Sequence, residues 1–343
     1  MSLGGSKANL ADRAAVFSGG RSRYNARPKT VPTETVMWFK NLLVYRFTRP
    51  FELTAEELNE KLDAMSFTPC GSQDQLSMGW ATPLGDAGNE LSHPCNGYIM
   101  LCLKQQEKVL PAAVVKEFLE EKVKDIEAND GRKPGRKERS QLKDEILFDL
   151  LPKAFVRSRR TYAYIDTRDN LLVIDSPSHK RAEDLMVLLR DSLGSLPVIP
   201  LQAKNTAQHV MTDWLVNNAP AGFEFGGECE LKDKADESAV IRAKNQDLHS
   251  KQIQSHLESG MFVSKLALHW QGGIDFVVDD QLTIKRLNFD DMIRDKADDI
   301  HSDTFAEQFD ADFSIMTAEI ARLLPAVLEA FGGEAESEGV QAA

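Results

Sequence analysis

Along the chain, apolar positions alternate with polar ones in some stretches and recur every three to four residues in others. This predicts both strands and helices. Residues 38–47 are typical of a strand, and a helix is expected after Thr54, which forms a capping box with Glu57. Further strands are predicted at 78–82, 98–104 and 107–110. Strands mixed with helices, several of them in antiparallel pairs, predict an α+β fold.

Two helical patterns flank a stretch rich in glycine and cations. The first is expected to end at Asn129, Asp130 and Gly131, and the second carries apolar residues from position 142 to 151. Because only a short polar stretch separates them, we predict an αα-hairpin whose loop is GRKPGRKERS, residues 131–140. The cations would then lie on a projecting helical tip.

The remaining pattern also combines both element types. A β-hairpin is predicted around residues 167–170, a helix over 178–193, and a C-terminal helix that ends near Gly332. From residue 239 the order strand, helix, three strands, helix repeats the order seen over 38–129, with little residue identity. This order suggests an internal duplication, that is, two related subdomains of sheet and helix.

These patterns divide the chain into five parts. They are a disordered N-terminal extension (1–35), a central α+β region (36–110 and 161–200), a helical tip with a basic loop (111–160), a second α+β region with the C-terminal helix (201–334) and a disordered tail (335–343). The extension is rich in Gly, Ser and Arg and lacks apolar periodicity. Its composition is also that of an organelle transit peptide, and an upstream start codon or an expression scar is a further explanation.

The composition agrees with a globular protein. The chain has 343 residues, of which 42% are hydrophobic and 27% charged, enough to bury a substantial core. No run of about 18 apolar residues occurs, and the first residues lack the apolar core of a secretory signal. The four cysteines are scattered without zinc-like spacing, so reduced thiols are expected. We therefore expect a soluble, cytoplasmic protein with no membrane span.

Charge is unevenly distributed along the chain. The formal net charge of −12 disfavours binding to a polyanion, but residues 132–160 contain ten cations and four anions. This segment therefore carries +6 and the remainder −18. Lys and Arg neutralise phosphates and release counterions, which makes the segment a candidate nucleic-acid interface, with a solvated loop as the alternative. The candidate DNA-binding residues of the loop are Arg132, Lys133, Arg136, Lys137 and Arg139.

Two further segments contain side chains that could bind nucleic acid or a protein partner. Arg242 and Lys244 are followed by Asn245 and Gln246, whose side chains can contact phosphates or sugars, although a polar strand edge is the ordinary explanation. Phe155 has cations on both sides and no apolar period to join. It fits an exposed anchor at a protein interface, a platform for a stacked base, or ordinary core packing.

No motif for catalysis stands out. Glu307, Asp310 and Asp312 offer carboxylates for a metal-dependent nuclease, but Asp310 and Asp312 are two residues apart on a predicted helix and point in different directions. Cys70 within FTPCGSQD shares only part of a papain-like pattern. The seven histidines have no metal-binding spacing, and neither GxGxxG nor a P-loop occurs. We therefore expect a protein without enzymatic activity, cofactor or metal.

Several stretches are specific enough to compare with a known family. They are WFKNLLVYR, FTPCGSQD, KDEILFDLLPKAF, SLGSLPVIPL, VIRAKNQDL, KLALHW and FDADF. Through them the chain from about residue 36 to 334 closely resembles the bacterial recombination-associated RdgC family. The residues before this region have no counterpart in that family.

The resemblance implies a non-catalytic homodimer that closes into a ring and binds single- and double-stranded DNA without sequence preference. It also implies restraint of RecA-driven strand exchange, in the nucleoid and at replication forks. Phe155 matches the family's gate aromatic, where two helical tips meet, and Arg132 matches a basic tip position. Lys244 and Gln246 match DNA-contacting positions, whereas Asn245 stands where relatives can carry lysine. An acidic module that binds RecA directly remains the second alternative beside a nuclease.

Overall fold

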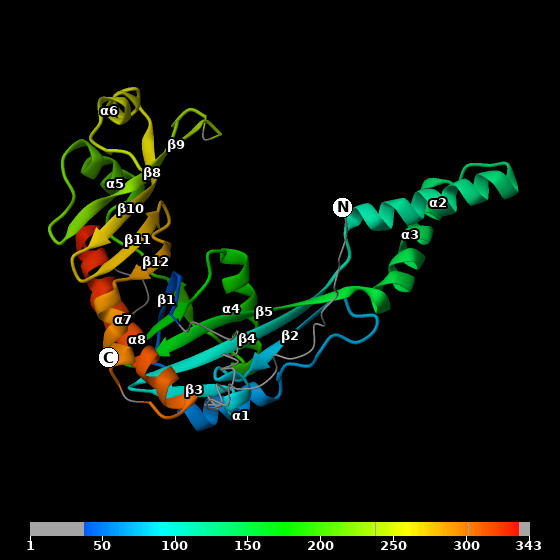
Figure 1. The fold of residues 1–343 in the computed structure, drawn as a ribbon, viewed down its shortest axis with the longest axis horizontal. Helices are drawn as coiled ribbons and strands as arrows, with labels where there is room; N and C mark the ends of the chain where they lie inside the picture. The colour runs from blue at the N-terminus through cyan, green and yellow to red at the C-terminus, as the bar shows by residue number, and fades with distance from the viewer. Residues whose placement is uncertain (1–37, 237, 301, 336–343) are drawn as a thin grey trace, which may run out of the picture. The chain divides into compact units, whose positions relative to one another are not determined.

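The computed structural model describes residues 38–236, 238–300 and 302–335. The predicted N-terminal extension and all but the first residue of the predicted tail lie outside the described residues. Within them the chain forms eight α-helices and one large antiparallel sheet, so the predicted α+β class is confirmed (Figure 1). Among the described helices, none is both long enough and apolar enough to cross a bilayer.

Twelve strands form the sheet. In chain order they are β1 (Asn41–Phe47), β2 (Leu76–Ala81), β3 (Ser92–Cys95), β4 (Tyr98–Val109), β5 (Phe155–Asp166), β6 (Leu171–Ile174), β7 (Val198–Pro200), β8 (Phe223–Lys232), β9 (Val240–Lys244), β10 (Phe262–Trp270), β11 (Ile274–Asp279) and β12 (Ile284–Phe289). Their spatial order is β2-β4-β5-β6-β1-β12-β11-β10-β8-β9, with β3 beside β4 and β7 beside β1. The strand β1 therefore joins the two halves of the sheet.

Capping interactions between residues close in the chain account for where several of the helices begin or end. They are α1 (Ala55–Asp63), α2 (Ala112–Asp130), α3 (Arg136–Leu150), α4 (His179–Leu193), α5 (Ala207–Val216), α6 (Lys251–Glu258), α7 (Asp291–Asp298) and α8 (Phe305–Ala330). The capping box of Thr54 and Glu57 is present at the start of α1. A second capping box, Thr304 with Glu307, starts α8, although the sequence analysis did not identify it.

Two predicted boundaries were wrong. The strands expected at 98–104 and 107–110 are the single strand β4, because Gln105 and Gln106 pair in register with β5 instead of interrupting the ladder. The loop expected over 131–140 is shorter, because α3 already begins at Arg136. The strand β8 was not predicted, since two adjacent glycines and several glutamates hide its alternation.

The two stretches with the same predicted element order differ in strand pairing. In the second, β10, β11 and β12 form a continuous meander. In the first, β2 and β3 each pair with β4. The element order is shared, but the hydrogen-bonded neighbours are not.

Helices cover the two halves of the sheet differently. The half that contains β4, β5, β6 and β1 is packed by α1 and α4 on one face, and the other face joins the core that includes α8. In the half from β8 to β12, one face packs on α5, α6, α7 and α8. Along β10, alternate residues are buried and partly exposed. This half therefore keeps one polar face, which we call the open sheet face.

Candidate nucleic-acid interface

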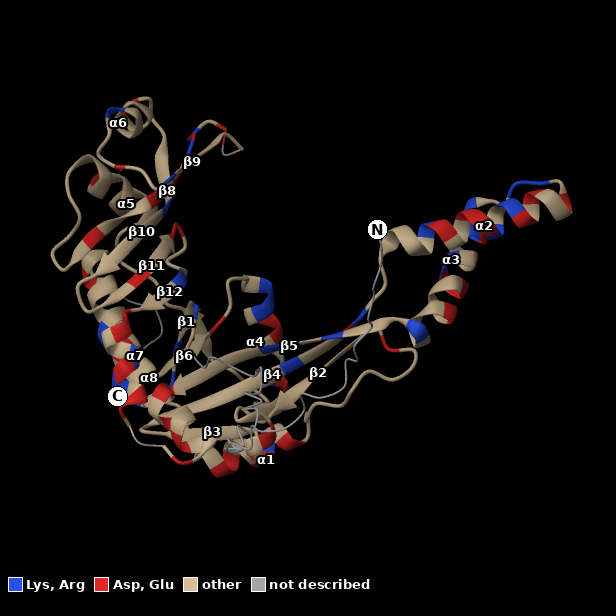
Figure 2. Ribbon diagram, viewed as in Figure 1, with Lys and Arg blue, Asp and Glu red and all other residues tan. Residues whose placement is uncertain are grey.

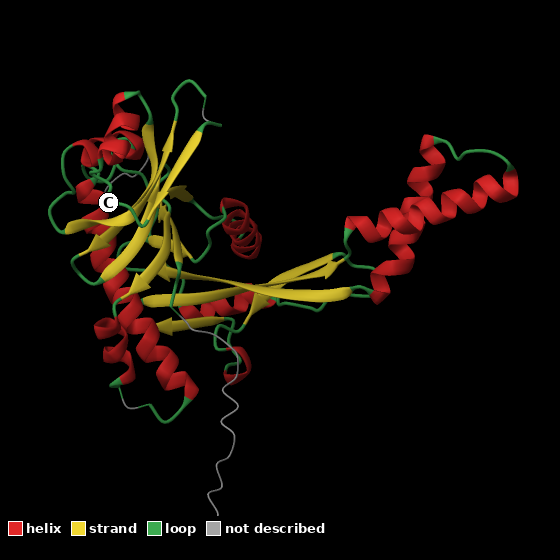
Figure 3. Ribbon diagram, turned by 45° about the horizontal axis from the view of Figure 1, so that its top comes forward, coloured by secondary structure: helices red, strands yellow, loops and turns green. Residues whose placement is uncertain are grey.

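The helices α2 and α3 lie between the long paired strands β4 and β5 in the chain. The helix α2 follows the end of β4, and α3 precedes the start of β5 (Figure 3). Gly131, with a positive φ of 63°, ends α2, and Gly135 precedes α3 without a capping side chain. The five predicted cations occupy this loop and the first turn of α3, where Figure 2 shows Lys and Arg in blue. All five are exposed. Cations in a first turn oppose the helix dipole, so a bound anion would stabilise this end of α3.

Arg132 differs from the other four cations in having carboxylate partners. Its guanidinium donates to Glu138 at 2.7 and 2.9 Å and to Asp130 at 3.4 Å. The hydrogen bond to Glu138 raises the pKa of Arg132 and lowers the pKa of Glu138. Lys133, Arg136, Lys137 and Arg139 form no ion pair with a described carboxylate, so they are the cations available to an external anion.

Acidic residues of the helix pair offset the positive charge that was counted along residues 132–160. Residues 112–150, which form α2, the loop and α3, contain nine cations and ten anions. The two helices pack against each other, and Lys122 of α2 reaches within 3.7 Å of Glu145 of α3. The helix pair is therefore not positive as a whole. An excess of cations over anions occurs only at the end that holds the loop, where Arg132, Lys133, Arg136, Lys137 and Arg139 stand against Asp130 and Glu138.

Phe155 is the first residue of β5 and pairs in register with Val109 at the far end of β4. Its side chain is 87% exposed, which excludes the core-packing explanation within this chain. Phe148, Val109 and Val156 are also exposed apolar residues of this part of the chain. Such a concentration of exposed apolar residues is typical of a surface that meets a partner.

Arg242 and Lys265 converge on Glu230 at the open sheet face. Arg242 Nε donates to one carboxylate oxygen of Glu230 at 2.7 Å, and Lys265 Nζ donates to the other at 2.8 Å. Burial alone would raise the pKa of Glu230, but hydrogen bonds from Lys265, Arg242 and Ser264 lower it to about 2. Arg242 is thus already neutralised, which leaves it less available to a phosphate than the sequence suggested.

The same face holds two further ion pairs. Lys285 Nζ lies 2.8 Å from Asp279, and an Arg286 guanidinium nitrogen lies 2.7 Å from Glu228. A cavity of about 350 Å³ is lined by these cations together with the Glu230 group. The sequence analysis missed Lys265 and Lys285, although their position in alternating strands could have placed them on a solvent face.

Lys244 and Gln246 lie at the end of β9 and in the turn after it. Lys244 is opposite Glu228 in the strand register but forms no ion pair with a described residue. Asn245 has a positive φ of 51°, and the backbone N–H of Gln246 donates to the carbonyl of Gly227 at 3.2 Å. A Cβ on Gly227 would lie 3.3 Å from Asn245 Cα, so the glycine permits this close approach.

The two predicted DNA-binding groups are on different parts of the sheet. The strand β9 is the edge strand at one end of the strand order, whereas β4 and β5 are the second and third strands from the other end. Phe155 belongs with the cations of the α2–α3 hairpin, because α2 and α3 connect the end of β4 to the start of β5, and Phe155 is the first residue of β5. The structure therefore brings Phe155 near the helix pair and leaves the β9 residues elsewhere.

The three carboxylates proposed for a nuclease do not form one site. Glu307 accepts hydrogen bonds from the backbone N–H groups of Asp303 and Thr304, at 2.8 and 3.1 Å. Asp310 is 2.5 Å from His93 Nε2. Burial raises the pKa of Asp312, which accepts a bond from Gln308 at 3.4 Å. Each carboxylate thus has a separate role in the fold.

Glu230 with its partners Arg242, Lys265 and Ser264 forms a group that we call the Glu230 cluster. We expect this cluster to make the stability of the fold depend on pH. Because the folded pKa is about 2, below the ordinary 4.5, the cluster stabilises the fold above pH 4.5 and this contribution is lost as pH falls toward 2. Glu230→Gln should therefore lower the free energy of unfolding at pH 7. The loss should be only about 1–2 kcal/mol, because Arg242 and Lys265 are partly exposed and solvent screens their interaction with Glu230. Urea titrations at pH 7, 5 and 3 should show the difference from wild type shrinking with acidity. Glu224→Gln, on the same strand, is the control, and a difference that stays constant with pH would contradict this account.

The geometry defines an α+β protein with one antiparallel sheet, an open polar sheet face, and an exposed phenylalanine beside a cation-bearing helix pair. The chain belongs to the RdgC family, since a family model described as "Putative exonuclease, RdgC" matches residues 37–334. The chain is 49% identical over 302 residues to the recombination-associated protein RdgC of Aeromonas hydrophila, which covers 88% of this chain and 100% of that protein. It is 48% identical, with the same coverage, to the protein of that name from Salmonella typhimurium. The resemblance inferred from the motifs is confirmed.

Proposed function

We propose that the protein binds DNA without sequence preference as a homodimer that encircles it. Occupied DNA would then be withheld from RecA, and recombination would be restrained without any catalytic step. The relatives' names support the link to recombination. One observation supports both DNA binding and dimerisation. Unpaired cations and an exposed aromatic residue lie on the same part of the chain, which runs from the end of β4 through α2 and α3 to the start of β5.

The dimer is argued from exposed apolar area. A phenylalanine with 87% of its surface in water, opposite exposed Val109 in the strand register, is unfavourable unless a partner covers it. A second copy that presents the same surface would bury both aromatic residues in an isologous contact. A ring needs a second contact elsewhere, after which release from DNA requires opening an interface as well as breaking phosphate contacts. The mass in solution should therefore be that of two chains for the protein alone, and that of two chains plus one duplex when a short duplex is added.

The DNA contact is argued from the cations that lack carboxylate partners. On the open sheet face, Arg242, Lys265, Lys285 and Arg286 are held by carboxylates. Lys244 is not, and neither are Lys133 of the α2–α3 loop and Arg136, Lys137 and Arg139 of the first turn of α3. These five can neutralise phosphates without first losing an ion pair, so they should supply most of the salt-dependent affinity.

Lys244 should make a single phosphate contact. Lys244→Gln should lower the slope of log affinity against log salt by about 0.9 on duplex DNA and weaken all sequences alike. Fluorescence anisotropy of a labelled duplex over a range of salt measures this. Lys234→Gln, in the loop before β9, removes an equal charge and should leave the slope unchanged. An unchanged slope for Lys244→Gln would remove this residue from the interface.

A metal-dependent nuclease is the alternative that the family description favours. Because Glu307, Asp310 and Asp312 face different partners, we expect no shortening of end-labelled linear duplex with Mg²⁺ or Mn²⁺. Degradation that disappears in Asp310→Asn and persists in Asp303→Asn would instead establish nuclease activity at these carboxylates.

A further inference from the structure

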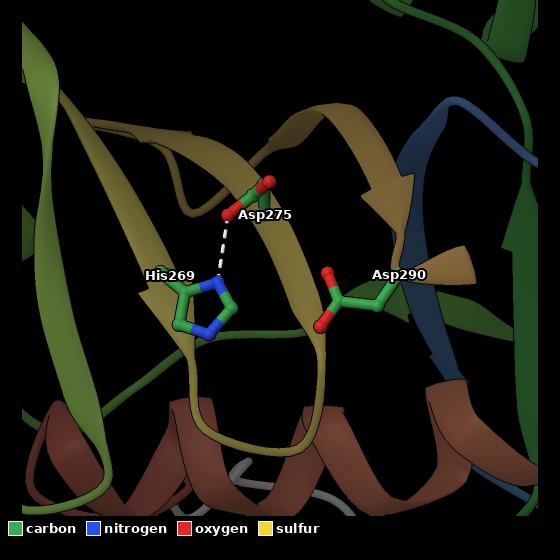
Figure 4. A group of neighbouring side chains, drawn as sticks. All are labelled: His269, Asp275 and Asp290. Carbon is green, nitrogen blue, oxygen red and sulfur yellow. Dashed lines mark hydrogen bonds and ion pairs between the residues drawn. The ribbon is translucent and has the colours of Figure 1, made fainter. Parts of the chain in front are cut away.

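Three side chains with metal-ligating atoms meet at one end of the open sheet face. They are His269 near the end of β10, Asp275 near the start of β11 and Asp290, which immediately precedes α7 (Figure 4). One imidazole nitrogen and one oxygen from each carboxylate all lie within 4.8 Å of one another. None of the three belongs to the carboxylates or cations discussed above.

Backbone structure holds the three residues in place. His269 and Asp275 are directly opposite in the β10–β11 register, so their side chains point to the same face, and His269 Nδ1 is 2.7 Å from Asp275 Oδ1. The backbone N–H of Asp290 donates to the carbonyl of Gly273 at 2.9 Å. Gly273 has a positive φ of 92°, and a Cβ there would lie 3.1 Å from Asp290 Oδ2. The β10–β11 turn therefore leaves room for the Asp290 carboxylate beside the histidine.

The Asp290 carboxylate has no other role in the described structure. It occupies the N-cap position of α7, where aspartate usually accepts a backbone N–H, yet its side chain makes no capping hydrogen bond. It also forms no ion pair with a described Lys or Arg. Two carboxylates thus lie close to one imidazole, which is hydrogen-bonded to Asp275. A divalent cation would neutralise both.

We propose that His269, Asp275 and Asp290 bind a first-row transition dication such as Mn²⁺ or Zn²⁺. An imidazole nitrogen with two carboxylate oxygens suits these ions better than Mg²⁺ or Ca²⁺, which prefer oxygen donors alone. On its other side His269 is opposite Glu224 of β8, whose carboxylate faces the same way and can supply a fourth ligand. The remaining positions would be open to water or to an anionic oxygen.

The position of the site connects it to the rest of the open sheet face. Lys265, Ala267 and His269 alternate along β10 on the partly exposed side, so the metal would lie on the same face as the Glu230 cluster. Metal binding itself does not depend on the proposed function, and it can be tested without DNA.

The test uses the whole protein and the metal alone. Titration with Mn²⁺, followed by electron paramagnetic resonance and by calorimetry, should show one saturable site per chain that Zn²⁺ displaces. Asp290→Asn keeps the size and leaves the His269–Asp275 pair intact, but it should weaken Mn²⁺ binding by at least about tenfold. Asp291→Asn removes the same charge one residue along the chain and should bind like wild type.

Several outcomes would overturn the assignment. The first is that the wild type shows no saturable binding of Mn²⁺ or Zn²⁺ at millimolar concentration. The second is that Asp290→Asn binds the metal as tightly as wild type, and the third is that Asp291→Asn loses as much affinity as Asp290→Asn. Stronger binding of Mg²⁺ than of Mn²⁺ would refute the proposed class of ion. His269→Gln is the second variant, and circular dichroism establishes that each variant is folded before its titration is interpreted.

Discussion

Phe155→Ala should leave the fold intact, weaken the association of two chains and shorten the time that the protein stays on closed circular DNA. The side chain is 87% exposed, so its removal takes almost nothing from the core. A central aromatic anchor at an interface typically contributes about 2 kcal/mol or more, so the dimer contact should weaken by roughly thirtyfold. Sedimentation equilibrium measures the association, and challenge of preformed complexes with competitor DNA measures the retention.

The topology of the DNA makes this prediction specific. If the contact acts as a gate of a ring, the loss of retention should be larger on closed circles than on short linear duplexes, which the wild type can also leave at the ends. Met292→Ala is the matched control, because Met292 is 79% exposed but lies on α7. An unchanged mass and an unchanged lifetime on circles in Phe155→Ala would exclude Phe155 from the dimer contact.

Neutralising the four unpaired cations of the α2–α3 loop and of the first turn of α3 should have the largest effect on DNA affinity. The slope of log affinity against log salt should fall by about 0.9 for each cation that contacts a phosphate, up to about 3.6 for four. Between 50 and 200 mM salt the wild type should therefore lose about 150-fold more affinity than the variant does. The variant replaces Lys133, Arg136, Lys137 and Arg139 by glutamine, and the control replaces Lys61, Arg190, Lys204 and Lys251.

The same variant separates occupation of DNA from a direct contact with RecA. If the protein acts by occupying DNA, inhibition of RecA-driven strand exchange should decline in parallel with DNA binding. Inhibition that persists after DNA binding is lost would support the acidic interaction module instead. Equal losses in the variant and in the control would show that net charge, and not the α2–α3 loop, governs the affinity.

Most helix boundaries follow from the sequence because they depend on neighbours a few residues away. Thr54 and Glu57 form their capping box within one turn, and Gly131 and Gly194 adopt the positive φ that ends α2 and α4. The β5–β6 hairpin and the meander of β10, β11 and β12 follow similarly from alternation and turn residues. The strand β8 could not be predicted in this way, because its glycines suppress the alternation.

The candidate sites depend on residues that are far apart in the chain. The sequence identified Arg242, but its partner Glu230 and the second cation Lys265 come from separate strands that only the β8–β9 and β8–β10 pairings bring together. His269 and Asp275 meet through strand register, and Asp290 joins them through a backbone hydrogen bond to the β10–β11 turn.

By itself the sequence determined the α+β class, most helix ends, the RdgC family and the location of the loop cations, because these depend on local interactions or on specific motifs. Only the tertiary structure decided which charges remain available. It paired Lys122 of α2 with Glu145 of α3, held Arg242 on Glu230 and left Phe155 in solvent. The reason is physical: charge neutralisation and burial depend on distances in space, and packing sets those distances between segments that the sequence separates.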